Sequence, residues 1–300
     1  MKKNDKAQFH LPGLFEFFEF YKVFLPIFRT RRDYFFDWVD IASIYGAPSD
    51  CIWGGGRLEY GESAPEEVAE FMDEFGISGR LTFSNSILKE ENLSDRRCNK
   101  LCKLFEKGVK QNGIIVYSDL LLEYLKENYP GFYFVSSTTK VITDFELLRN
   151  ELRREDFDFV VPDFRFNGRM DLLNDLSAQE KSKVEFLCNE CCDIGCSERK
   201  LCYENVSRKM LGEECPDHVC PSSGAEQGYL FSKAMKSPAF IGKGDIEKVY
   251  LPAGFSNFKI EGRGLGSALI LEFLLYYLVK PDKQLEIREM VYLDNSLNLF

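Results

Sequence analysis

The feature that most constrains the fold of this sequence is a repeated alternation of short β-rich runs with longer helical patterns. Runs such as 113–118 (GIIVYS) are apolar at nearly every position, which is typical of strands buried on both faces. Parallel strands need a crossover of about a dozen residues between them, usually a helix. We therefore predict a parallel sheet with strands at 20–28, 50–55, 80–85, 113–119, 132–138, 157–164, 183–189 and 257–262.

Each expected strand is followed by a helical pattern or by a stretch long enough to hold a helix. The helical patterns lie at 31–46, 64–76, 95–108, 119–129, 143–156, 244–254 and 264–279. Eight such units predict an α/β fold, a single-domain (β/α)8 TIM-like barrel, whose usual size is about 250 residues. An open doubly wound sheet is the alternative, but no G-x-G-x-x-G turn follows an early strand. We expect the barrel over residues 13–300 and a flexible N-terminal segment over 1–12.

One unit departs from this rhythm, because more than fifty residues, 190–243, separate the seventh expected strand from the next helix. Long insertions on compact domains are usually functional or disordered. This insertion, about 188–240, leaves the carboxyl end of a strand, and barrels of this kind build their active sites on that face. The sequence therefore predicts a functional Cys-rich loop after the seventh strand.

Seven of the ten cysteines of the chain fall within 33 residues of this loop. A disulfide framework would need an oxidising compartment, and buried structural thiols rarely crowd in this way. Metal binding remains: C-x2-C followed by C-x3-C resembles ferredoxin-like spacing, whereas a later C-x4-C pair with His218 leaves zinc open. The candidates are Cys188, Cys191, Cys192, Cys196, Cys202, Cys215 and Cys220.

Charge and hydropathy narrow the class of protein. The formal net charge is −10 and the pI about 5.0, so broad electrostatic binding of nucleic acid is disfavoured. The apolar run 265–279 contains Glu272 and is shorter than the ~20 residues that span a membrane. The N-terminal residues lack the pattern of a secretory signal. We expect a cytoplasmic protein without a membrane-spanning segment.

Three segments carry a resemblance to a known family. The segment 253–278 contains Lys259, Ile260, Glu261, Gly262 and Arg263, a strand ending in Lys-Ile-Glu-Gly-Arg directly before a helix. The segments 46–56 (GAPSDCIWGGG) and 186–196 (FLCNECCDIGC) match further family motifs in the same order. The sequence resembles the collagenase-like peptidases of unassigned catalytic type. Relatives in that family include hydroxylation proteins that act on transfer RNA, ribosomal RNA or the ubiquinone ring.

The resemblance implies a 4Fe–4S cluster held by four cysteines around the seventh strand and its downstream loop, with zinc as the alternative metal. Carried over by motif, the ligands would be Cys192, Cys196, Cys215 and Cys220, with the other three thiols of the loop in reserve. The family usually continues Glu-Gly-Arg with a Met-Lys-like pair, whereas this chain has Gly264 and Leu265. Together with the negative charge, this departure makes a nucleic-acid substrate less expected.

Polar residues at the ends of expected strands are the remaining candidates, because strand ends of a barrel converge on one mouth. As catalytic residues we predict Glu261, Arg263, Asp119 and Asp163. As residues that bind a cofactor we predict Arg165, Asn189 and Glu190. With two histidines, His10 and His218, the chain has no HExxH motif and no convincing Ser–His–Asp set.

We therefore expect an iron–sulfur enzyme or enzyme component. It would modify, and by the resemblance hydroxylate, a small or carrier-bound substrate, with an electron donor or a partner protein. A non-catalytic binding protein with a structural zinc or iron–sulfur site is the alternative, because metal binding can fold a loop with little core of its own. A protease is the third hypothesis, and only the name of the family that the sequence resembles supports it.

Overall fold

The computed structural model of the protein describes residues 6–56, 63–222 and 225–297. Its strands are β1 Ala7–Pro12, β2 Val39–Gly46, β3 Ser78–Phe83, β4 Gly113–Val116, β5 Tyr133–Ser136, β6 Phe159–Val160, β7 Glu185–Leu187 and β8 Asn257–Lys259. They form one sheet in the order β6-β5-β4-β3-β2-β1-β8-β7, with every pairing parallel. A parallel bridge between Val160 and Val184 joins its two edges. The prediction of a (β/α)8 TIM-like barrel is therefore confirmed, with the ring of strands nearly closed.

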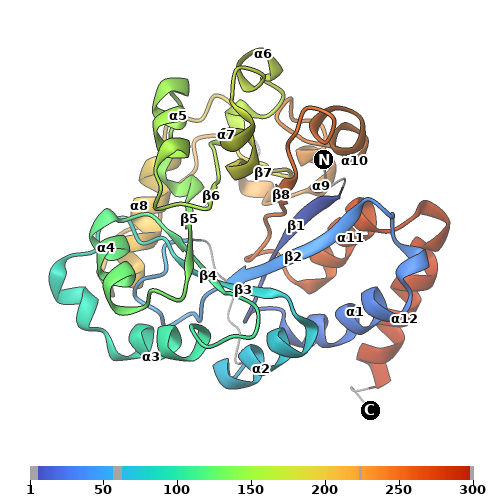
Figure 1. The fold of residues 1–300 in the computed structure, drawn as a ribbon, viewed down its shortest axis with the longest axis horizontal. Helices are drawn as coiled ribbons and strands as arrows, with labels where there is room; N and C mark the ends of the chain where they lie inside the picture. Colours follow the sequence, from blue (N-terminus) through green and yellow to red (C-terminus); the bar gives the residue numbers. More distant parts are fainter. Residues whose placement is uncertain (1–5, 57–62, 223–224, 298–300) are drawn as a thin grey trace.

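Helices lie outside the ring of strands and connect one strand to the next (Figure 1). The helices outside the Cys-rich loop are α1 Phe18–Thr30, α2 Pro65–Phe75, α3 Arg96–Phe105, α4 Asp119–Asn128, α5 Phe145–Arg153, α6 Met170–Leu173, α7 Ala178–Lys183, α11 Ser267–Leu278 and α12 Gln284–Leu297. The apolar run 265–279 forms α11, most of whose side chains are buried. In the described part of the chain, no helix is long and apolar enough to cross a membrane.

The Cys-rich loop after β7 is present and has its own helices. These are α8 Arg199–Met210 and α9 Phe231–Ala234; α10 Lys243–Asp245, which continues into a π-helical turn over Ile246–Tyr250, follows the loop. Helix α8 lies against the loop that follows β3, because the Asn85 amide donates to the carbonyl oxygens of Ser207 (3.1 Å) and Ile52 (2.9 Å). The insertion is thus fixed to the opposite side of the barrel mouth.

The first third of the chain departs from the sequence-based prediction. Residues 7–12, expected to be flexible, form the central strand β1, whereas the expected strand at 20–28 lies within α1. There the buried side chains Phe18, Tyr21 and Phe24 recur every three residues, the spacing of a helix face. Four phenylalanines within 14–20, at 15, 17, 18 and 20, hid that period. The segment 50–55 is not a strand; β2 lies instead within 31–46, where a helix was expected.

The interior of the barrel contains a buried ion cluster from four strands. Glu185 of β7 accepts a 2.5 Å hydrogen bond from Arg80 of β3, and the ammonium of Lys259 on β8 lies 3.4 Å from its other oxygen. The Nε2 atom of His10, on β1, lies 3.5 Å from Glu185, and its Nδ1 atom hydrogen-bonds the Ser43 hydroxyl at 2.8 Å. One carboxylate therefore connects strands that are far apart in the sequence.

Electrostatics fix the protonation of this cluster. Burial acts to raise the pKa of Glu185, but the charges of Arg80 and Lys259 outweigh it and hold that pKa at about 2. Burial, followed by the positive charge of Arg80, lowers the pKa of His10 to about 3. Around neutral pH the interior thus carries two cations, one carboxylate and a neutral imidazole.

We predict that His10 makes the fold acid-sensitive. Its ordinary pKa of 6.5 falls to about 3 on folding, so the unfolded chain binds the proton more tightly and stability is lost as pH falls from 6.5 towards 3. Between pH 7 and about pH 4.5 the protonation of the unfolded chain at His10 lowers the free energy of unfolding by about 2.5 kcal/mol, since each pH unit below the unfolded pKa is worth about 1.4 kcal/mol. In a His10→Asn variant, urea unfolding at the two pH values should show a difference smaller by that amount. An unchanged pH dependence would contradict the prediction.

Candidate functional site

The loops that follow β7 and β8 are joined side by side at the barrel mouth. The side chain of Asn189 accepts a hydrogen bond from the Glu261 backbone N–H (2.8 Å) and donates to the Glu261 carbonyl (3.2 Å). The Tyr229 hydroxyl donates to the Asn189 carbonyl at 2.8 Å. Asn189, which the sequence predicted to bind a cofactor, therefore sets the position of Glu261 relative to the cysteine-rich loop.

A cavity of about 480 Å³ lies at this mouth, within the range of small-molecule sites. Its floor is formed by side chains of the barrel interior, namely Tyr45, Ile115, Val161 and Leu187. One wall belongs to the insertion, whose residues Cys191, Cys192, Cys202 and Cys220 line the cavity together with His218. The loop after β8 adds Glu261 and Arg263 on another side.

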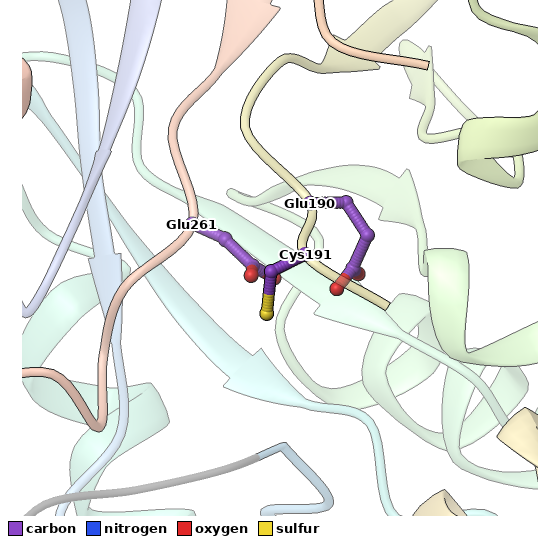
Figure 2. A group of neighbouring side chains, drawn as sticks. All are labelled: Glu190, Cys191 and Glu261. Carbon is purple, nitrogen blue, oxygen red and sulfur yellow. The ribbon is translucent and has the colours of Figure 1, made fainter. Parts of the chain in front are cut away.

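Figure 2 shows the tightest group of potential metal ligands in the described part of the chain. The Cys191 thiol and the carboxylates of Glu190 and Glu261 offer ligand atoms that all lie within 4.8 Å of one another. Among the residues described, no other group of three or more His, Cys, Asp or Glu side chains meets that distance. Glu190 and Glu261 were both predicted as site residues, and the structure brings them together.

A buried ion network holds the thiol-bearing loop in place. Arg199, the first residue of α8, pairs with Glu190 at 2.7 Å and with Asp163 at 3.7 Å. Arg165 pairs with Asp163 at 2.9 Å and donates to the carbonyls of Ile194 (2.8 Å) and Cys196. Asp163 and Arg165 thus position the loop, and Arg199, which sequence reasoning missed, is the centre of the network.

The thiols of Cys192 and Cys196 are hydrogen-bonded to each other. Burial, and then the charge of Glu190, raise the pKa of Cys192 to about 12, so the metal-free thiol is protonated at neutral pH. A metal ion binds the thiolate and displaces that proton. Cys215 accepts a hydrogen bond from the Asn205 amide at 3.6 Å and, like Cys196, is not among the residues that line the cavity.

Two predicted catalytic residues have well-defined partners. Arg263 donates to Glu16 at 2.8 Å and is buried with it. Asp119, at the start of α4, is 66% exposed, pairs with Arg154 at 2.8 Å and does not line the mouth cavity.

The cavity is also lined by Lys259, which the sequence analysis named only as part of a motif. Burial lowers its pKa to about 8, with Arg80 and Arg263 opposing the pull of Glu185.

The fold and the site define a (β/α)8 barrel with a thiol-lined cavity at its mouth. No family model matches the sequence, and no curated protein matches it. Among solved structures, the chain is similar to the one titled "The Structure of the U32 Peptidase Mk0906". The TM-score is 0.53 at 12% identity, over 87% of this chain and 95% of that chain. At this identity the likeness concerns the barrel fold alone.

We predict that removal of the Arg199 guanidinium destabilises the insertion. An Arg199→Met variant leaves Glu190 and Asp163 buried with too little positive charge, a change that typically costs about 3–5 kcal/mol. Urea unfolding should show this loss of stability. Under native conditions, a thiol reagent should modify Cys192 faster in the Arg199→Met variant than in the unchanged protein. The matched control is Arg208→Met on the same helix, whose partner Glu213 is half-exposed, with an expected loss under about 1 kcal/mol. Equal stability of the two variants would refute the assigned role.

Proposed function

We propose that this protein is an iron–sulfur enzyme or enzyme component that holds its cluster at the barrel mouth and modifies a small or carrier-bound substrate. The observation that carries the proposal is the cavity wall, on which four thiols from separate parts of the insertion share one space. Thiolates are the usual ligands of iron–sulfur clusters. Their place at the carboxyl ends of the strands is where barrels of this kind carry out their chemistry.

The arrangement of the donors favours a cluster over a single zinc ion. A structural zinc ion needs four thiol or imidazole donors that converge on one point. Among the described residues the convergent group is instead one thiol with two carboxylates. A cluster takes one thiolate at each of four irons, so its thiols surround it at wider spacing. Four thiols around one cavity fit that donor set.

The lining of the cavity also indicates which cysteines are the better candidate ligands. Cys192 and Cys220 line it and belong to the set implied by the family resemblance. Cys191 and Cys202 line it as well, whereas Cys196 and Cys215 do not. We propose Cys191, Cys192, Cys202 and Cys220 as the ligands, in place of the motif-based set with Cys196 and Cys215.

The chain's own residues suit a substrate next to such a site. When bound and held by four thiolates, a cluster would supply one-electron transfer. Glu261 lies beside Cys191 on the cavity wall, where its carboxylate can hold a substrate proton. Arg263, fixed by Glu16, presents a cation to polar substrate groups. Hydroxylation is the reaction that the family resemblance suggests, and an electron donor would be the partner.

We predict an iron-loaded, coloured protein after anaerobic purification. Iron and sulfide assays should give about four of each per chain, with a broad visible absorption band. Single Cys192→Ser and Cys220→Ser variants should lose most of the iron. The Cys202→Ser variant should also lose most of the iron, whereas the Cys215→Ser variant should keep it, since Cys202 lines the cavity and Cys215 does not. The control is Cys98→Ser, whose buried thiol lies 3.0 Å from Cys51 and outside this cavity.

Other outcomes would replace the proposal. About one zinc per colourless chain, bound by the same cysteines, would make the site structural and remove the redox chemistry. Iron loss in Cys215→Ser but not in Cys202→Ser would restore the motif-based ligand set. Cleavage of gelatin or casein by chain without iron would favour a peptidase.

A further inference from the structure

Three residues that line the mouth cavity have buried polar atoms without partners among the described residues. The hydroxyl oxygens of Thr82 and Ser84 and the Nη2 atom of Arg263 are fully buried, and they have no hydrogen-bond partner in the described part of the chain. All three residues line the cavity. Burial of such groups without partners costs free energy, and this cost is recovered when a ligand supplies the missing bonds.

The barrel interior at the cavity floor has an excess of positive charge, whereas the carboxylate of Glu261 lies on the wall beside Cys191. In the barrel interior, Arg80 and Lys259 share the single carboxylate of Glu185, while His10 is neutral at pH 7. This leaves one unbalanced positive charge, and of the two cations only Lys259 lines the mouth cavity. A buried, uncompensated charge is unfavourable, so the cavity floor is suited to one negative charge.

These groups line the same cavity from two sides of the barrel. Thr82 and Ser84 come from β3 and its end, whereas Lys259 and Arg263 come from β8 and the loop after it. The chain at Gly55 and Gly56 passes close to both sides, since a Cβ on Gly55 would approach the Ser84 backbone at 2.3 Å and one on Gly56 would lie 3.1 Å from the Arg263 guanidinium. The thiols line the cavity from the insertion, so cluster and anion would occupy different sides.

We infer that the cavity binds a small organic molecule with a single carboxylate. The carboxylate lies between Lys259 and Arg263 and accepts from the hydroxyls of Thr82 and Ser84, and an apolar body packs on the floor formed by Ile115, Val161 and Leu187. This names the substrate class of the proposed enzyme and rests on that function for its chemistry. A phosphate group carries about −1.5 to −2 charges at pH 7 and exceeds the one charge available.

The test is calorimetric titration of the full-length protein with three carboxylates of different shape, phenylacetate, cyclohexanecarboxylate and hexanoate. Each is compared with its own amide, which keeps the shape and removes the charge, and with inorganic phosphate. At least one carboxylate should bind saturably, about tenfold or more tighter than its amide and tighter than phosphate. If none is preferred over its amide, or if phosphate binds best, the inference is wrong.

Variants locate the binding. Lys259→Met should abolish the preference for the carboxylate. Thr82→Val should weaken binding severalfold and leave thermal stability equal or higher, because it removes an unpartnered hydroxyl; a structural role would lower stability instead. The control is Thr138→Val in the same cavity, whose hydroxyl already donates to the Pro162 carbonyl at 3.1 Å; its affinity should stay within about twofold.

The two proposals fail separately. An iron-loaded protein without carboxylate preference keeps the iron–sulfur proposal and overturns the substrate class. If the protein is colourless but binds the carboxylate, and the Thr82→Val variant loses that binding, the anion site is supported and the redox function is overturned. Titration of the Cys192→Ser variant measures the anion site without depending on the cluster.

Discussion

The ion pair between Glu185 and Arg80 is the interaction on which the rest of the structure depends. It crosses the barrel interior from β7 to β3, and the same carboxylate lies within reach of Lys259 and His10. Buried ion pairs add little net stability compared with apolar packing, but breaking one is costly. The pair therefore specifies how these strands face one another.

A second buried network positions the insertion relative to the barrel. Arg199 connects the start of α8 to Glu190 and Asp163, and Asn189 hydrogen-bonds the loop after β8. The thiols are thus carried by a segment whose first residues are fixed before any metal binds. Metal coordination would then add folding energy to this loop.

Sequence periodicity predicted the strands β3 to β8 and the barrel they form, because each short apolar run is followed by a clear helical pattern. It failed for residues 7–46. There the phenylalanine-rich segment 14–28 fits either a strand or a helix, and its burial against the barrel decides for the helix. The cysteine-rich loop and the 259–263 motif were found from local spacing. Arg199 was not, since nothing in its neighbourhood shows that it is buried.

The strand–helix alternation, the place of the insertion and the concentration of thiols within it could be read from the amino acids alone, because these are local patterns along the chain. Only the tertiary structure decided that Cys202 shares a cavity with Cys191 while Cys215 does not. It also decided that Thr82 lines that cavity with an unpartnered hydroxyl and that two interior cations share Glu185. Such proximities arise only when the chain folds, because pairs such as Arg80 and Glu185 are 105 positions apart in the sequence.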